Sequence, residues 1–218
     1  MQTILITGAT GSFGQAFAHT YAAQGAQLIL AGRQEKTLKT FAETLENRYG
    51  IETGLIVLDY WNFSPEAAIA LKAELQAAYP SLTGIIHAAA YLGVRADLAQ
   101  YPAWEWLKVF QVLVHGPFLL TQTLLPLCAT QANLIFMNSY WPNSEGAYWG
   151  AYGVAQAAVK KMVETLAVEQ PQLNLQSYAP GPTFSRLYAK AYPADIDPNL
   201  LFPDQRLVRD LENRVLTL

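Results

Sequence analysis

Residues 3–14 read TILITGATGSFG, and this stretch decides how the rest of the chain is organised. Its first five residues are apolar or β-branched and predict a buried strand. Gly8, Gly11 and Gly14 follow at once, before a segment that predicts a helix from Ala16 to Gln24. A glycine-rich turn at this place lets the backbone approach a pyrophosphate, and the helix N-terminus adds free amides and partial positive charge. Tight turns also need glycine, so the pattern alone leaves a purely structural turn open.

Apolar runs and helical patterns alternate along the chain after this turn. Further strands are expected at residues 27–31, 55–58, 85–87, 134–137 and 173–178, and helices at residues 37–49, 64–79, 102–127 and 152–169. This alternation, without repeats or linkers, predicts one domain over residues 1–218. Its fold class is α/β, a doubly wound parallel sheet with helices on both faces. Such sheets bind ligands beyond the carboxyl ends of their strands, where this sequence places Gly8, Asp59, His87, Ser139 and Pro180.

The composition argues against several functional classes. Of the 218 residues, 52% are hydrophobic and 14% are charged, which is typical of a globular domain rather than of a disordered chain. A net charge of -3 argues against nucleic-acid binding, since phosphate backbones are bound by clustered Lys and Arg. The apolar runs are shorter than the roughly 18 residues of a membrane span, and no basic leader precedes the first strand. We therefore expect a cytoplasmic protein that does not bind membranes. Cys128 is the single cysteine, and no His, Cys and carboxylate cluster has metal spacing, so we expect no metal.

Five features together resemble the short-chain dehydrogenase/reductase family. They are TGATGSFG at residues 7–14, HAAA at residues 87–90, Ser139, Tyr152 and Pro180-Gly181, in the family's order and spacing. The resemblance covers the chain from Thr3 to about Leu200. It implies a Rossmann-type fold and an NAD(P)(H)-dependent oxidoreductase that acts on a small-molecule carbonyl or alcohol. The family usually ends in a seventh strand after a helix, which we expect here to be short, at residues 215–218, or missing.

The resemblance also implies a cofactor site. The family usually carries TGxxxGxG, so Ser12, which stands where a glycine is expected, makes this loop a variant. The residues implied to bind the cofactor are Gly8, Thr10, Gly11, Ser12, Phe13, Gly14, Arg33, Asp59, Ala88, Ala89, Pro180, Gly181, Thr183 and Ser185.

Arg33 bears on the choice between NADP(H) and NAD(H). Sites that prefer NAD(H) place a carboxylate after the second strand, where it binds the ribose 2′-hydroxyl and repels a 2′-phosphate. This sequence has Gly32-Arg33 there, and a guanidinium suits a phosphate. We therefore favour NADP(H), while NAD(H) and a plain surface arginine stay open as alternatives. Asp59 resembles the family's adenine-contacting Asp, and the alternative is a cap for the turn that follows.

Ser139, Tyr152 and Gln156 form the candidate catalytic group. The family's catalytic set is Asn, Ser, Tyr and Lys, and Ser139 precedes Tyr152 by the family's 13 residues. The Lys belongs four residues after the Tyr, where this chain has Gln156, and the Asn belongs where VLVHGPF has Leu113. In the family the ammonium holds the nicotinamide ribose and lowers the pKa of the phenol, while the Asn holds water that relays protons to the Lys.

A neutral amide at position 156 predicts a phenol that keeps its proton. An opposite charge nearby lowers a pKa by roughly 1–3 units, and a free Tyr titrates near ~10. Lys160 is no substitute, because it lies about 12 Å further along the helix than Tyr152. Reducing a carbonyl needs only a phenol O–H donor, whereas oxidising an alcohol needs a phenolate-like base. We therefore expect a carbonyl reductase with weakened acid–base machinery. The alternative is a non-catalytic nucleotide-binding homologue that acts as a sensor or partner-binding module.

The remaining expectations concern two histidines, a segment that would cover the substrate, and the oligomeric state. His87 replaces the family's first Asn in NNAG and is expected to pack at its strand end. His115 would face the site only if its helix were distorted. Residues 184–202 would form a substrate lid. The family commonly dimerises through its two long helices, here about residues 102–127 and 152–169, so we expect a homodimer. A concentration-independent monomer mass in light scattering would count against it.

Overall fold

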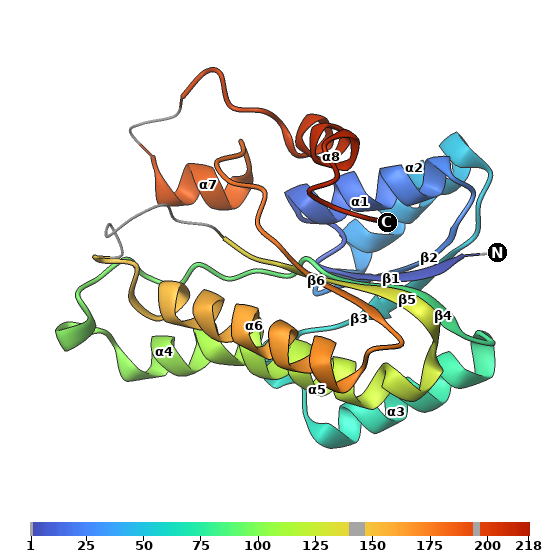
Figure 1. The fold of residues 1–218 in the computed structure, drawn as a ribbon, viewed down its shortest axis with the longest axis horizontal. Helices are drawn as coiled ribbons and strands as arrows, with labels where there is room; N and C mark the ends of the chain where they lie inside the picture. Colours follow the sequence, from blue (N-terminus) through green and yellow to red (C-terminus); the bar gives the residue numbers. More distant parts are fainter. Residues whose placement is uncertain (1, 140–146, 194–196) are drawn as a thin grey trace.

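A six-stranded parallel sheet forms the centre of the molecule. The computed structural model describes residues 2–139, 147–193 and 197–218. The strands are β1 (Thr3–Thr7), β2 (Gln27–Gly32), β3 (Thr53–Val57), β4 (Leu82–His87), β5 (Cys128–Met137) and β6 (Asn174–Tyr178). They lie in the order β3-β2-β1-β4-β5-β6, and every neighbouring pair is parallel (Figure 1). This confirms the Rossmann-type sheet, whose strand order reverses between β1 and β4.

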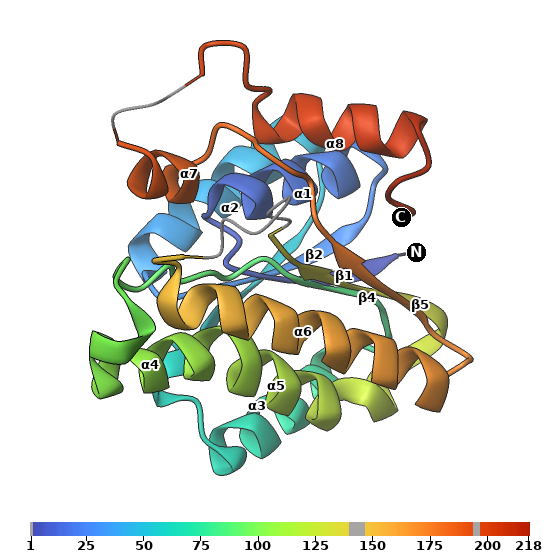
Figure 2. The same ribbon diagram turned by 60° about the vertical axis from the view of Figure 1, so that its left-hand side comes forward.

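Helices cover both faces of the sheet, as Figures 1 and 2 show. One face carries α1 (Ser12–Ala23), α2 (Glu35–Tyr49) and α8 (Pro203–Glu212). The other carries α3 (Pro65–Ala78), α4 (Ala103–Phe110), α5 (Gly116–Leu124) and α6 (Gly150–Glu169). The short helix α7 (Arg186–Ala191) follows β6, and its first residue donates its N–H to Ser12 at the start of α1.

The central strand β1 is buried on both faces, which explains its uninterrupted apolar sequence. Ile4 and Ile6 pack into the layer that contains Phe17 of α1. Leu5 faces the opposite layer, which contains Leu120 of α5. Each such side chain contributes roughly 1.5–3 kcal/mol when it is fully buried. The two helical layers are therefore both joined to the strand from which the glycine-rich turn leaves.

The predicted helix at residues 102–127 is a continuous helical run with a widened turn in its middle. It consists of α4, a π-helical turn at Gln111–His115, α5, and a 3-10 turn at Leu125–Leu127. Pro117 has no N–H to donate, which favours an irregular turn before it. The run Ala103–Leu127 has 25 residues and a mean hydropathy of 1.2, and by length and composition alone it could cross a membrane. In this domain the run packs against α3 and α6.

The π-helical turn sets the direction of two side chains that the sequence singled out. The N–H of Gly116 donates to the carbonyl of Gln111, five residues back. A Cβ on Gly116 would lie 2.5 Å from the Tyr60 ring, so the helix approaches that ring closely. Leu113 is buried, whereas His115 is exposed. His115 could have faced the site only if its helix were distorted. The π-helical turn is such a distortion, but it leaves His115 exposed at the surface.

The end of the chain adds a helix and no seventh strand to the described part of the sheet. Residues 215–218 pair with no strand, so of the two expected outcomes, a short seventh strand or a missing one, the structure shows the second. The side chain of Gln176 on β6 takes the place of strand pairing. Its Nε2 donates to the carbonyl of Thr217 at 3.0 Å, and its Oε1 accepts from the Thr217 N–H at 3.2 Å. A side-chain amide thus satisfies the backbone groups that a ladder would have used.

Asp210 fastens α8 to the sheet. Its side chain is buried at 3% exposure and accepts hydrogen bonds from the Tyr178 hydroxyl at 2.6 Å and from Arg206 Nε at 2.9 Å. Removing one member of a buried charged pair costs about 3–5 kcal/mol, because the remaining charge loses its partner. The contact therefore holds the residues that follow β6 in place.

His87 is part of the core, as the sequence suggested. Hydrogen bonds join its Nδ1 to the Tyr60 hydroxyl at 3.4 Å and its Nε2 to Thr121 Oγ1 at 2.9 Å. Its ring stacks on Phe136 with 4.3 Å between centroids. Burial lowers the pKa of His87 from 6.5 to about 3. The imidazole is therefore neutral at physiological pH and holds β4, β5 and α5 together.

This burial predicts a measurable dependence of stability on pH. The unfolded chain takes up a proton on His87 near pH 6.5, whereas the folded chain takes it up only near pH 3. The stabilisation is present above pH 6.5 and is lost as the pH falls. Between pH 7 and pH 5, His87 alone should lower the free energy of unfolding by about 2 kcal/mol. In urea titrations His87→Asn should lose this component and His115→Asn should keep it. Equal pH dependence in wild type and His87→Asn would contradict the assignment.

Candidate functional site

A cavity of about 700 Å³ lies beyond the carboxyl ends of the strands. Residues that follow all six strands line it: Gly8 after β1, Arg33 after β2, Asp59 after β3, Ala88 after β4, Ser139 after β5 and Pro180 after β6. Tyr152 and Gln156 of α6 and Leu113 of the π-helical turn complete one wall. The fold thus brings together residues that lie up to 172 positions apart in the sequence, at the place where doubly wound sheets bind ligands.

The glycine-rich turn is shaped by contacts that exclude side chains. Gly8 has a left-handed φ of +62°, and a Cβ on it would lie 2.5 Å from the Ala89 Cα. A Cβ on Gly14 would lie 2.2 Å from the carbonyl oxygen of Gly8. Gly11 caps α1 without a side-chain hydrogen bond, so no side chain of the cap covers the first amides of the helix. Free amides at the start of a 12-residue helix form an anion site.

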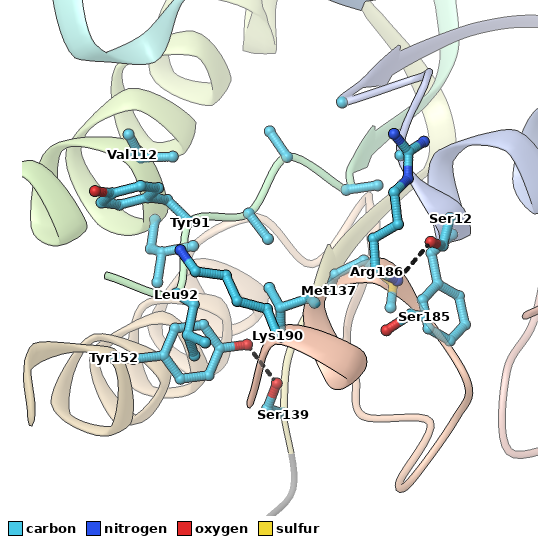
Figure 3. A pocket seen from close by; sticks show the side chains of 18 of the residues that line it. Ser12, Tyr91, Leu92, Val112, Met137, Ser139, Tyr152, Ser185, Arg186 and Lys190 are labelled. Atoms are coloured by element: carbon cyan, nitrogen blue, oxygen red, sulfur yellow. Dashed lines mark hydrogen bonds between the residues drawn. The ribbon is translucent and has the colours of Figure 1, made fainter. Parts of the chain in front are cut away.

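Arg186, which no sequence pattern singled out, contacts this turn from α7. Its guanidinium donates to the carbonyl of Thr10, and its backbone N–H donates to Ser12 Oγ at 3.2 Å (Figure 3). It lines the cavity together with the glycine-rich turn. A cation that follows the PGPTFS segment directly was the only local signal for it.

The Ser139 and Tyr152 hydroxyls form the polar centre of the opposite wall. Ser139 Oγ and the Tyr152 hydroxyl oxygen are 2.6 Å apart, as the dashed line in Figure 3 marks. Ser139 lies just past the end of β5, and Tyr152 lies in the first turn of α6 with only 2% of its surface exposed. Both oxygens can donate to one carbonyl oxygen, which is the arrangement that a reductase or a carbonyl-binding site needs.

Asn138 positions this pair and was also missed from the sequence. Its Oδ1 accepts from the Ser139 N–H at 2.7 Å, and its Nδ2 donates to the Gln156 carbonyl at 3.0 Å. One side chain therefore joins the end of β5 to the second turn of α6. Its position immediately before Ser139 was the sequence signal, although a polar residue at a strand end says little by itself.

No cation of the described residues acts on the Tyr152 phenol to lower its pKa. Burial raises the pKa above its ordinary value of 10, while hydrogen bonds with Ser139 and Gln156 act more weakly in the opposite direction. The phenol is therefore protonated at neutral pH. Gln156 is buried at 6% exposure and lines the cavity, and its Oε1 has no hydrogen-bond partner among the described residues. A buried acceptor without a partner calls for a donor from a ligand, such as a hydroxyl.

Sixteen of the seventeen site residues proposed from the sequence line this cavity, and Gly14 does not. Gly14 lies behind the turn and allows α1 to pack on Gly8. Asp59 lines the cavity, and its carboxylate also caps the next turn by accepting from the Trp61 N–H at 3.1 Å. Ser185 likewise caps α7 by accepting from the Tyr188 N–H at 3.1 Å. The capping alternative considered for Asp59 is therefore present.

The cavity is basic although the chain is acidic. Among the described residues its wall holds four cations and one carboxylate, whereas the whole chain has a net charge of -3. The cations are Arg33, Lys108, Arg186 and Lys190, and the carboxylate is Asp59. A concave wall with one sign of charge concentrates ions of the opposite sign. Arg33 is exposed and does not form a described ion pair. No group of three metal-ligating side chains occurs in the described ranges.

Comparisons with known proteins agree with this geometry. Residues 2–195 match the family model described as short chain dehydrogenase. The oxidoreductase YciK of Escherichia coli (strain K12), itself uncharacterised, is 34% identical over 201 residues, which are 91% of this chain and 79% of the relative. A short chain dehydrogenase from Escherichia coli CFT073 complexed with NADPH has a TM-score of 0.90 at 31% identity and covers 98% of this chain and 89% of its own. Another, from Shigella flexneri 2a str. 301 complexed with NADP, has a TM-score of 0.89 at 32% identity and covers 93% and 86%.

Proposed function

The chain belongs to the short-chain dehydrogenase/reductase family, and on this premise we propose that it is an NADP(H)-dependent reductase of small-molecule carbonyl compounds. One observation carries the proposal. A protonated phenol, Tyr152, lies 2.6 Å from the Ser139 hydroxyl in a cavity that also holds a glycine-rich turn. The carbonyl compound gains a hydride at carbon and a proton at oxygen and leaves as the alcohol.

The residues of the cavity fit a nicotinamide dinucleotide. The turn at Gly8 and Gly11 has no Cβ atoms to obstruct a pyrophosphate, and the amides of α1 face it. Gln156 Oε1 is the buried acceptor that a ribose hydroxyl would satisfy. Arg33 stands where a 2′-phosphate would lie in a site of this fold. The family's structural neighbours that contain NADP or NADPH support the same assignment. When bound, the reduced cofactor supplies the hydride.

The chain's own residues supply binding and the proton. Ser139 donates a hydrogen bond to the substrate oxygen and aligns it with the phenol, and Tyr152 gives its proton to that oxygen. Tyr152 must then recover a proton from solvent, because Gln156 carries none to give and Leu113 is apolar. Without a cation beside the phenol, the oxidising direction lacks its base. Losing tuned acid–base assistance costs roughly 10²–10⁴-fold in rate, so the proposed reductase is slow.

A non-catalytic nucleotide-binding protein is the second candidate. Gln156 and Leu113 favour it, since both replace groups of the family's proton path. Such a protein would retain the cavity and bind NADPH without turnover.

The homodimer, the cytoplasmic location and the lack of nucleic-acid, membrane and metal binding stay predictions. Large apolar side chains are exposed on the helices expected at the dimer contact: Trp104, Leu107, Phe118, Val154 and Val168.

Replacing Tyr152 by Phe tests the reductase directly. Tyr152→Phe should lower NADPH-dependent reduction of aldehydes, ketones or quinones at least 100-fold, because the proton donor is removed. The Kd for NADPH should change less than twofold. Tyr148→Phe, at an exposed tyrosine in the turn before α6, is the matched control and should retain full activity. Tight NADPH binding by wild type without turnover on any of these substrates would instead favour the second candidate.

Restoring the family's residues tests the weakened proton path. The double variant Gln156→Lys with Leu113→Asn should gain about 10- to 100-fold in activity, and alcohol oxidation should appear near pH 8–9 as the phenol pKa falls. Gln24→Lys adds the same charge at an exposed position and should change nothing. If wild type is already as fast as the double variant, the missing charge does not limit the enzyme.

Arg33→Ala tests the choice of cofactor. The variant should weaken NADPH binding by about 10- to 100-fold, the range of one charge-assisted hydrogen bond, and leave NADH binding unchanged. Fluorescence titration of both nucleotides measures this, with Arg209→Ala on the exposed side of α8 as control. An equal change for NADPH and NADH would show that Arg33 does not read the 2′-phosphate.

A further inference from the structure

Two lysines from separate helices meet over one aromatic ring in the cavity. The ammonium of Lys108 on α4 lies 5.0 Å from the centroid of the Tyr91 ring, and that of Lys190 on α7 lies 5.7 Å from it. All three residues line the cavity. Figure 3 shows Lys190 extending from α7 toward Tyr91. The site of the proposed reductase thus includes two positive charges that the proposed reaction does not use.

Neither ammonium has an anionic partner in the described part of the protein. No carboxylate of those residues lies within 4.0 Å of either lysine. A carboxylate does contact the ring itself: Glu105 Oε1 accepts from the Tyr91 hydroxyl at 2.7 Å. Glu105 is buried at 1% exposure and does not line the cavity, so it orients the ring from behind. The cavity side of the ring therefore presents positive charge to a ligand.

Whereas the Arg186 guanidinium contacts the glycine-rich turn, Lys190, one helical turn further on, places its ammonium over the Tyr91 ring. It lies on α7, whose Leu187 and Tyr188 also line the cavity, and this helix belongs to the segment expected to cover a substrate. Lys108 also lies 5.7 Å from the ring of Trp61, whose N–H donates to Asp59, so it adjoins the expected cofactor region as well. Lys190 is therefore the candidate anchor for the substrate, with Lys108 in support.

We propose that the substrate is an anion: an aldehyde or ketone that also carries a carboxylate or sulfonate group, held by Lys190 and Lys108 while its carbonyl oxygen lies at Tyr152 and Ser139. This inference rests on the proposed reductase function and names its substrate class. An ammonium in a partly enclosed cavity binds such a group by charge-assisted hydrogen bonds, each of which strengthens binding by roughly 10- to 100-fold. The basic wall also raises the local concentration of anions.

The test compares one carbonyl compound with and without its charge. Wild type should reduce 4-oxobutanoate with at least a tenfold higher kcat/KM than the methyl ester of the same acid. Lys190→Met should lower kcat/KM for the acid at least tenfold more than it lowers kcat/KM for the ester, and the Kd for NADPH should stay within twofold. Lys160→Met, at an exposed lysine of α6 outside the cavity wall, is the control and should behave as wild type. Lys108→Met should reduce the preference in part.

Two results would overturn the proposal. Wild type without a preference for the acid would show that the lysines do not select the substrate. A rise in the Kd for NADPH in Lys190→Met, with parallel losses for acid and ester, would show that Lys190 binds a cofactor phosphate instead.

A binding measurement separates this inference from the reductase function itself. If wild type reduces neither compound, succinate and the neutral succinamide are titrated calorimetrically into the NADPH-loaded protein. Succinate should bind wild type at least tenfold more tightly than it binds Lys190→Met, and more tightly than succinamide binds. Equal binding of succinate and succinamide would overturn the anion site, whereas selective succinate binding would support it even where turnover is absent.

Discussion

The close approach of three backbone segments at Gly8 shapes the end of the cavity where the sheet changes its strand order. A Cβ on Gly8 would overlap Ala89 after β4, and a Cβ on Gly14 would overlap the carbonyl of Gly8. Because β1 and β4 are the central pair of the sheet, this contact fixes the point where the strand order reverses. It also lays the first turn of α1 directly beside that point. At this end the cavity therefore takes its shape from backbone positions that have no side chains.

Hydrogen bonds, and not a charge, hold the Tyr152 phenol in position. Asn138 fixes both Ser139 and the turn of α6 that carries Gln156, so the geometry of a proton donor survives without the family's lysine. An ammonium beside the phenol would stabilise the phenolate, whereas a neutral amide in a buried setting does so only weakly. Geometry and charge are thus separable in this fold. The site preserves the geometry that reduction needs and lacks the charge that oxidation needs.

Local patterns were sufficient to predict the sheet and most of the cavity, and they failed where distant residues decide the outcome. The glycine-rich turn and the alternation of strands and helices are readable because each depends on neighbours in sequence. Residues 215–218 look like a strand, but the Gln176 side chain, 41 residues away, takes up their backbone groups. Arg186 and Lys190 look like ordinary surface charges until α7 folds over the cavity. The contact of Arg186 with Thr10 spans 176 residues, and no local pattern encodes it.

The distribution of charge in the cavity suggests that binding, more than acid–base tuning, is what its cations provide. The described wall has no cation at position 156, where a lysine would tune the phenol, yet it holds four cations elsewhere, two of them on α7. A charge that holds a remote carboxylate or phosphate acts equally on the bound ground state and on the transition state. Such uniform binding lowers KM without raising kcat. Under the proposed function, the enzyme would capture an anionic substrate at low concentration and convert it slowly, because its cations would hold the ligand and leave the proton donor untuned.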